Sequence, residues 1–205
     1  MTEQKQHADP TALGLFGLAI VTLVASSQKL GLTSGLSYVI PWALFMGAMA
    51  QLIAGILDFR KGNAFGGTAF CAYGFFWMAM ACSWLINMGV FGETLRVAVD
   101  THEMAFAFLG YLVVTVFFTI GAATTNKVLF FIFFFIDTLF LGLTVSTFVA
   151  DGPVHIFFHY FAAVSELLIA ILSFYGSGAN IVNTQVGRAV LPIGKAFGPL
   201  KKRTA

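Results

Sequence analysis

Six apolar runs are the feature that most constrains what this chain can fold into. Each is long enough to cross the roughly 30 Å hydrocarbon core of a bilayer as a helix, and the breaks between them are short and polar. The runs are Ala12–Gln28, Ser37–Leu57, Gly67–Gly89, Met104–Ala123, Val128–Val149 and His155–Gly176. Only 10% of the residues are charged, against roughly 25% in an average soluble domain. The sequence therefore predicts an all-α membrane protein with six transmembrane helices in one bundle.

The polar segments predict how the chain is divided and oriented. Residues 1–11 are expected to be a cytoplasmic segment, 12–176 the six-helix domain and 177–205 a cytoplasmic tail. No short apolar stretch ending in a cleavage site precedes the first run, so we expect that run to be retained. With six spans, nine of the eleven Lys and Arg residues lie on one side, and Lys29 and Arg96 lie on the other. Because cytoplasmic loops are rich in basic residues, both termini are predicted to be cytoplasmic, in a plasma membrane for which a bacterial inner membrane is favoured.

Two polar residues mark where helices are expected to begin. Asp9 can accept backbone N–H groups at the start of the first helix, and Pro10 suits the first helical position because its missing N–H would be unpaired there. Asn63 is expected to cap or turn the chain before the third span. Gln51, inside the second span, is expected to form a hydrogen bond across helices.

Cys71 and Cys82 lie about 16 Å apart along one helix, which is beyond disulfide reach.

Ionisable residues inside apolar runs are functional candidates, because a charge in a bilayer is costly. Asp137 lies in the middle of the fifth run, and Glu166 lies midway along the sixth. His155, His159 and Glu166 share one helix face. Three interpretations of that face stay open: a metal site, for which the carboxylate lies too far along the helix; a proton-responsive cluster; and a hydrogen-bonded contact between helices or subunits, which leads.

The sequence contains no pattern typical of an enzyme. There is no phosphate-binding loop followed by Lys and Ser or Thr, no Cys-x-x-Cys pair and no HExxH motif. We therefore expect no catalytic residues, no cofactor, no metal and no nucleic-acid partner.

Three blocks resemble one known family. The segment DPTALGL, Asp9–Leu15, is similar to the Asn-Pro-Ala-Pro-Leu-Gly-Leu signature of the acetate uptake transporter family, which includes the succinate–acetate permeases. Ala50–Trp77, AQLIAGILDFRKGNAFGGTAFCAYGFFW, resembles the family segment that joins its second and third helices. Gly187–Gly194, GRAVLPIG, resembles the end of bacterial members. The resemblance covers essentially Asp9–Gly194.

The resemblance implies a fold and an activity. The expected protomer is a six-helix bundle of the acid-activated urea-channel type, assembled as a homo-hexamer with a pore through each protomer. The expected substrates are acetate and related short carboxylates, succinate among them. Transport is expected either as proton-coupled uptake or as anion-channel behaviour.

The resemblance also implies site residues. The family constriction, a Phe, a Tyr and a Leu, aligns with Leu18, Tyr73 and Ile136, and Phe16 stands two residues before Leu18. The expected substrate path along the first helix comprises Asp9, Pro10, Leu13, Gly14, Leu15 and Phe16. Asp9 replaces the Asn of the family signature and adds a negative charge. The candidates for proton coupling come instead from the ionisable residues inside the apolar runs: Asp137, Glu166 and His159.

Two alternatives to carboxylate transport stay open. The chain is also consistent with a pore for another small solute such as ammonia or urea. It is equally consistent with a membrane sensor or scaffold that keeps the fold and does not conduct.

Overall fold

The structure is a computed structural model that describes residues 8–149 and 151–197. Its main elements are six long helices. The elements are α1 (Thr11–Lys29), α2 (Val39–Trp42), the π-helix η1 (Ala43–Ala50), α3 (Gln51–Arg60), α4 (Ala64–Asn87), α5 (Glu93–Val97), α6 (Thr101–Ala122), α7 (Lys127–Phe148) and α8 (Pro153–Val186). α2, η1 and α3 form one continuous helix. That helix, α1, α4, α6, α7 and α8 are each long and apolar enough to span a membrane, which confirms the predicted six spans.

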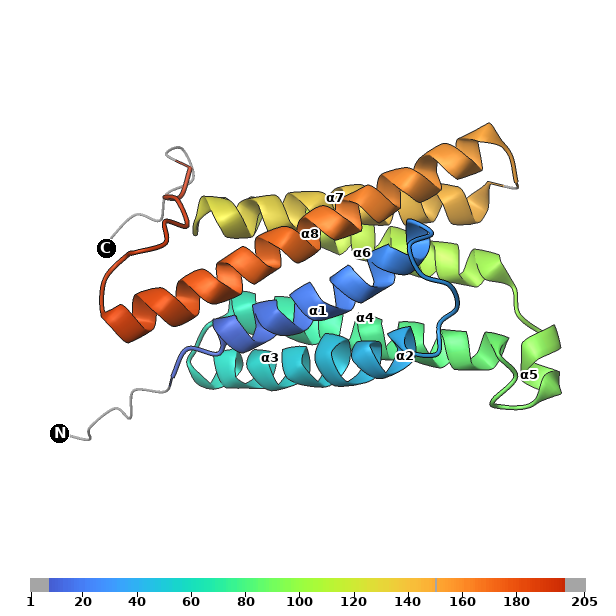
Figure 1. The fold of residues 1–205 in the computed structure, drawn as a ribbon, viewed down its shortest axis with the longest axis horizontal. Coiled ribbons are helices and arrows are strands. Elements are labelled where there is room, and N and C mark those ends of the chain that lie inside the picture. Colours follow the sequence, from blue (N-terminus) through green and yellow to red (C-terminus); the bar gives the residue numbers. More distant parts are fainter. Residues whose placement is uncertain (1–7, 150, 198–205) are drawn as a thin grey trace.

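The helices are arranged as a ring that is open along one side. α1 packs against α8 on one flank and against η1 and α3 on the other, while α8 packs on α7, α7 on α6, and α3 on α4. The α4 and α6 backbones lie close together at few positions, so on this open side the two helices meet chiefly through long side chains such as Tyr111. α1 begins and α8 ends at the same end of the bundle (Figure 1). We call this end the base and the opposite end, where α5 lies, the top.

The helix boundaries differ from the predicted runs in three places. α8 continues past Gly176 to Val186 and ends where Gly187 adopts a left-handed conformation. The predicted second span contains η1, an eight-residue π-helix, which an all-apolar sequence does not reveal. The break between the third and fourth spans contains the short helix α5.

Asp9 and Asn63 both accept backbone N–H groups at helix starts, as predicted. Asp9 Oδ1 accepts the Thr11 N–H at 3.0 Å. Pro10 directly precedes the first residue of α1 instead of occupying it, a one-residue shift within the usual fraying of helix ends. Asn63 caps α4, because its side-chain oxygen accepts the Gly66 N–H at 3.2 Å.

A small residue sets how closely α1 approaches the second span. A Cβ atom on Gly17 would lie 2.5 Å from the Met46 carbonyl oxygen and 3.1 Å from the Ala50 Cβ. Only glycine permits this contact, in the manner of small-residue helix contacts in membranes.

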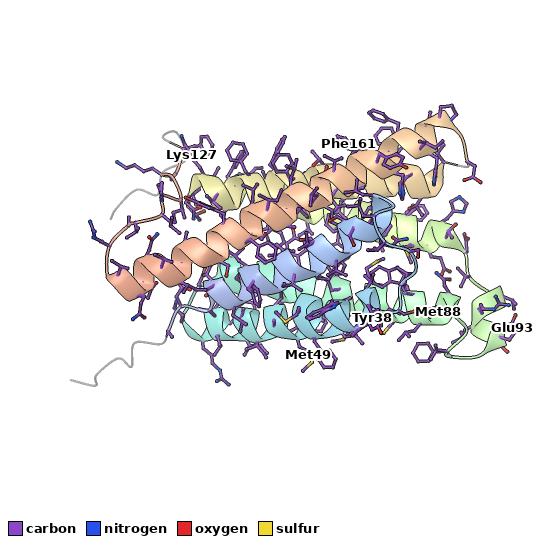
Figure 2. The ribbon with its side chains drawn as sticks, in the orientation of Figure 1. Tyr38, Met49, Met88, Glu93, Lys127 and Phe161 are labelled. Atoms are coloured by element: carbon purple, nitrogen blue, oxygen red, sulfur yellow. The ribbon has the colours of Figure 1, made fainter. Side chains whose placement is uncertain are left out.

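The outer surface of the bundle is apolar along its sides and charged at its ends. Met49 is exposed on the outside of the second span, whereas Lys127 lies at the base and Glu93 at the top (Figure 2). This distribution suits helices whose sides face lipid and whose ends face water.

Candidate functional site

A cavity of about 340 Å³ opens at the base of the bundle, between α1, α3, α4, α6 and α7. Leu18, Tyr73 and Ile136, three residues on three different helices, all line it. Each of the three residues lies roughly 10–14 Å along its helix from the end at the base, at about 1.5 Å per residue. The structure therefore brings the three predicted constriction residues to the inner part of one cavity.

Only part of the predicted path along α1 faces this base cavity. Leu15 lines it, and Thr11, which the sequence analysis did not single out, does so as well. Leu13 and Phe16 are 39% and 41% exposed and point away from the core. Gly14 packs against the Phe70 ring. A single helix turns its successive residues to different sides, so a contiguous run such as Leu13–Phe16 cannot all face one cavity.

Asp9 and Pro10 lie at the rim of the base and are not among the cavity's lining residues. The Lys61 Nζ lies 3.4 Å from Asp9 Oδ1. Partial burial acts to raise the pKa of the Asp9 carboxyl, but hydrogen bonds from Thr11 and the charge of Lys61 outweigh it and leave the pKa below its ordinary value. Asp9 is thus an ionised group that Lys61 partly neutralises.

A second cavity, of about 610 Å³, lies at the top between α4 and α6. Its wall is mostly apolar and includes two carboxylates, Asp100 and Glu103. The backbone N–H of His102 donates to Asp100 and lowers the pKa of that carboxyl. The top cavity shares no lining residue with the base cavity.

Aromatic rings separate the two cavities. Tyr73, which lines the base cavity, packs against Tyr111, which lines the top cavity, with ring centroids 6.3 Å apart. Phe76 packs edge-to-face on Tyr111 at 5.0 Å and on Phe140 at 5.1 Å. Phe140 stacks on Tyr73 at 6.4 Å. These four rings form an aromatic layer between the two cavities.

The hydrogen bonds of the aromatic layer fix where its hydroxyl protons point. Thr115 Oγ1 lies 2.6 Å from the Tyr111 carbonyl oxygen and 2.9 Å from the Tyr73 hydroxyl oxygen. A carbonyl oxygen only accepts, and a Thr hydroxyl carries one proton, so Thr115 donates to Tyr111 and Tyr73 must donate to Thr115. The Tyr111 hydroxyl donates to the Ala72 carbonyl at 2.9 Å. Both Tyr protons are thus committed to acceptors within the layer.

Two buried polar side chains on α3 line the base cavity with unpaired oxygens. Gln51 does not bond across helices as predicted: its Nε2 donates at 2.8 Å to the Gly47 carbonyl, one turn earlier in its own helix. Within the described residues, Gln51 Oε1 and both carboxylate oxygens of Asp58 accept no hydrogen bond of ordinary geometry, and the Asn63 side chain lies beside the Asp58 carboxylate. Sequence reasoning missed Asp58; its spacing of seven from Gln51, which places both on one helix face, was the available signal.

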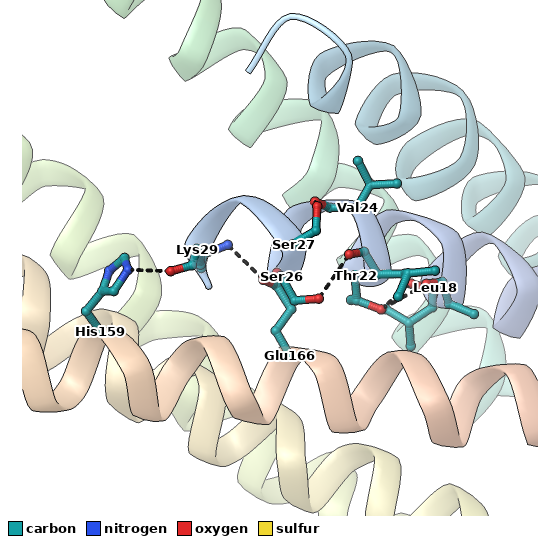
Figure 3. A network of polar contacts seen from close by, with 10 residues as sticks. Leu18, Thr22, Val24, Ser26, Ser27, Lys29, His159 and Glu166 are labelled. Atoms are coloured by element: carbon teal, nitrogen blue, oxygen red, sulfur yellow. Dashed lines mark hydrogen bonds and ion pairs between the residues drawn. The ribbon is translucent and has the colours of Figure 1, made fainter. Parts of the chain in front are cut away.

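The intramembrane charge at Glu166 has a partner that sequence reasoning did not find. The Lys29 Nζ at the end of α1 lies 2.9 Å from Glu166 Oε2 on α8, and His159 Nε2 lies 3.0 Å from the Lys29 carbonyl oxygen (Figure 3). His155 bonds instead to the Ser146 carbonyl at 2.8 Å. The shared face of α8 is therefore a contact between helices, which was the leading interpretation, and its residues are not among those lining either cavity.

Asp137 lies beside the predicted constriction and faces α6. Its Oδ2 accepts the Thr119 hydroxyl at 2.6 Å, while its Oδ1 is buried without a partner among the described residues. Neighbouring residues of a helix point about 100° apart, so Ile136 reaches the base cavity and Asp137 does not line it.

Comparison with known proteins identifies the family. A succinate-acetate/proton symporter, SatP, from Escherichia coli is 31% identical over 92% of this chain and 96% of its own. Ammonia transport outward protein 2 from Saccharomyces cerevisiae is 29% identical over 88% of this chain and 64% of its own. A solved structure of the bacterial acetate channel SatP matches with a TM-score of 0.83 and 30% identity, over 92% of this chain and all of that one. The model of the GPR1/FUN34/yaaH family matches residues 1–194, so the chain belongs to that family.

Proposed function

We propose that this protein transports acetate and related short carboxylates, succinate among them, along the axis of each protomer. The observation that carries the proposal is the base cavity, which ends inward at Leu18, Tyr73 and Ile136 below the aromatic layer. An apolar constriction excludes hydrated inorganic ions. A small carboxylate has an apolar methyl or methylene part that tolerates such a ring, and its charged end can meet one hydroxyl.

The relatives support this substrate class. The E. coli relative is named for succinate, acetate and protons, and the matched structure is described as an acetate channel. Both cover nearly the whole chain. The activity proposed here is permeation with no bond making, so the chain is proposed not to be an enzyme.

We further propose that the base faces the cytoplasm of a bacterial cell, with both termini on that side of the inner membrane. Arg60, Lys61, Lys127, Arg188 and Lys195 lie at the base, whereas Lys29 and Arg96 lie at the top. A protease added to right-side-out vesicles would cut a tag at either terminus if this orientation were reversed.

The proposed assembly is a homo-hexamer in the lipid membrane, as the family resemblance implies. Large apolar side chains such as Phe106, Phe117 and Ile120 on α6 are exposed in the single chain and would face lipid or other copies. The mass of the solubilised particle, with bound detergent subtracted, tests the number of protomers.

Uptake of radiolabelled acetate into liposomes carrying the purified protein tests the function. We expect initial rates above those of protein-free liposomes, and competition by succinate. A non-conducting scaffold gives no uptake above the control. A pore for ammonia, which the yeast relative's name favours as the second candidate, conducts ammonia and ignores carboxylate competitors.

Whether protons accompany the anion is tested by imposing a pH gradient on the same liposomes. Asp137, Glu166 and His159 are the proton-coupling residues proposed from the sequence. Substitution of each by its neutral counterpart flattens the pH dependence of uptake if that residue carries the proton.

A further inference from the structure

The segment after α8 runs across the base of the bundle and ends beside the start of α7 (Figure 1). We call residues 188–197 the strap. α8 ends at Gly187, whose backbone is left-handed, so the chain turns sharply there and runs back toward α6 and α7. The strap is not part of either cavity wall, yet it is held by specific contacts at both of its ends.

Two side chains of α8 hold the first part of the strap. Asn183 Oδ1 accepts the N–H groups of Val190 at 2.7 Å and Leu191 at 2.9 Å, and Asn183 Nδ2 donates to the Leu191 carbonyl at 2.8 Å. The Tyr175 hydroxyl donates to the Pro192 carbonyl at 2.7 Å. The strap is thus fastened to α8 before it reaches α7.

The far part of the strap bonds to both helices of the α6–α7 corner. The Val128 N–H, in the first turn of α7, donates to the Ile193 carbonyl at 3.1 Å, and the Phe197 N–H donates to the Ala123 carbonyl at the end of α6 at 3.0 Å. Both are groups that a helix end leaves without an intrahelical partner. The Phe197 ring packs edge-to-face on Phe130 of α7, with centroids 4.7 Å apart. The strap therefore caps two helices from a third.

A glycine lets the strap approach α7 this closely. Gly194 has a φ of +77°, and a Cβ atom there would lie 2.8 Å from the Lys127 Cβ. A larger residue would be strained in this conformation and would push the strap away from the start of α7.

The corner that the strap holds forms one wall of the base cavity. Thr124 and Thr125, in the turn between α6 and α7, line the cavity together with Leu129 in the first turn of α7. Thr11 and Asn63, at the base ends of α1 and α4, line the opposite wall. Helix ends are the parts that fray most readily, so a capped corner keeps a fixed distance from that wall. This distance decides how large a solute can enter.

We propose that the strap sets the width of the base entrance and thereby how well larger dicarboxylates enter compared with acetate. Asn183 and Tyr175 touch no substrate. They are positioning residues that act through the α6–α7 corner. When the strap is released, the corner moves outward, while Leu18 and Tyr73, on α1 and α4, keep their places. This inference rests on the proposed function, which supplies the substrates.

The first test compares initial uptake of labelled succinate and labelled acetate into liposomes. Asn183→Ala removes three bonds to the strap, so the succinate-to-acetate ratio should rise several-fold. The gain should appear as a lower KM for succinate, because the entrance controls access and not passage through the constriction. Asn180→Ala is the matched control: Asn180 lies on α8 close to Asn183 and donates to the Gly176 carbonyl of its own helix, so the wild-type ratio should be kept. Tyr175→Phe, which removes one bond, should raise the ratio less.

The second test measures the entrance without transport. Leu15 is 3% exposed and lines the base cavity. Leu15→Cys, in a chain whose free Cys71 and Cys82 are replaced by Ser, can react with maleimides that enter from the base. A small maleimide should react at similar rates with and without Asn183→Ala. A maleimide with a bulky substituent should react several-fold faster when Asn183→Ala is present.

The outcomes separate this inference from the proposed function. Wild-type liposomes that take up no acetate above protein-free controls overturn the proposed function, while the maleimide rates still decide whether the strap sets the entrance. Unchanged maleimide rates in both Asn183→Ala and Phe197→Ala overturn the inference, whatever the uptake. An equal loss of succinate and acetate uptake in Asn183→Ala also overturns it, because the strap would then only stabilise the fold.

Hydrogen exchange of the wild-type protein serves if Asn183→Ala does not fold. The amides of Val128 and Phe197 should exchange slowly, because the strap holds both in hydrogen bonds. Fast exchange of both amides would show that the strap does not hold the corner and would overturn the inference.

Discussion

Two buried carboxylates in this molecule, Glu166 and Asp58, have different surroundings. Glu166 is 1% exposed at the contact between α1 and α8, and Lys29 neutralises it at 2.9 Å. Asp58 is equally buried and forms no ion pair within the described residues, but it lines a cavity. A charge inside an apolar bundle is tolerated when it is paired within the protein. The comparison teaches that a buried carboxylate without a counter-charge beside a cavity is the better sign of function, and Glu166→Gln tests the paired half of that rule.

The largest effect is expected from Glu166→Gln, which leaves the Lys29 ammonium without its counter-charge. Breaking a buried ion pair typically costs about 3–5 kcal/mol, and the Lys29 side chain keeps 17% exposure, so we expect a loss of about 3 kcal/mol in unfolding free energy. Denaturant unfolding in detergent measures it, and the double variant Lys29→Met with Glu166→Leu should regain most of the loss. Because Glu166 is held in an ion pair, we expect an unchanged pH profile of acetate uptake. A flattened profile would indicate that Glu166 carries the proton.

The next effect concerns the aromatic layer. Thr115→Val removes the acceptor of the Tyr73 hydroxyl and keeps the shape of the side chain. A buried donor without a partner costs about 2 kcal/mol, and the freed Tyr73 proton becomes available to a passing carboxylate. We therefore expect lower stability and faster acetate uptake than in the wild type, while Thr115→Ser stays near wild type. Equal uptake by the Val and Ser variants would show that the Tyr73 proton does not limit passage.

A smaller, substrate-dependent effect is expected at the constriction. Leu18→Phe places a bulkier ring at the inner part of the base cavity, where Leu18 is 6% exposed. Uptake of succinate should then fall several-fold more than uptake of acetate, because the larger substrate meets the narrower opening. Competition between the two labelled substrates measures the ratio. An equal reduction for both would argue against a size-selective ring at this position.

The smallest effect is expected from Asp9→Asn, because Asn also accepts backbone N–H groups at helix starts. The pKa of Asp9 is lowered in the folded protein, so its stabilising contribution is complete above the unfolded pKa of about 4 and is lost as the pH falls through the lower folded value. The variant should lose less than about 1 kcal/mol at neutral pH and nothing in strong acid. A large gain in acetate uptake would show that the Asp9 charge opposes the substrate.

Much of the fold was predictable because the membrane imposes it. Backbone groups in hydrocarbon must be hydrogen-bonded within their own segment, so a run of about 20 apolar residues forms a helix. The caps were predictable for a similar reason, since Asp9 and Asn63 each accept a backbone N–H within a few residues of themselves. The family resemblance then pointed to Leu18, Tyr73 and Ile136, which do share one cavity.

The π-helix η1 and the polar contacts of the spans were not predictable in the same way. Gln51 was expected to bond to another helix and bonds to its own, and Glu166 was not expected to meet Lys29, which lies 137 residues away in the chain. In helices that are apolar on all sides, the hydrophobic pattern does not indicate which face points inward.

The sequence by itself thus determined the number of spans, their approximate limits and the family, because these depend on local hydrogen bonding and on motifs. Only the tertiary structure decided which carboxylate is paired and which faces a cavity. The physical reason is that a charge is stabilised or left unpaired by groups on neighbouring helices, and the rotation and pairing of those helices come from side-chain packing such as that of Gly17 on Met46.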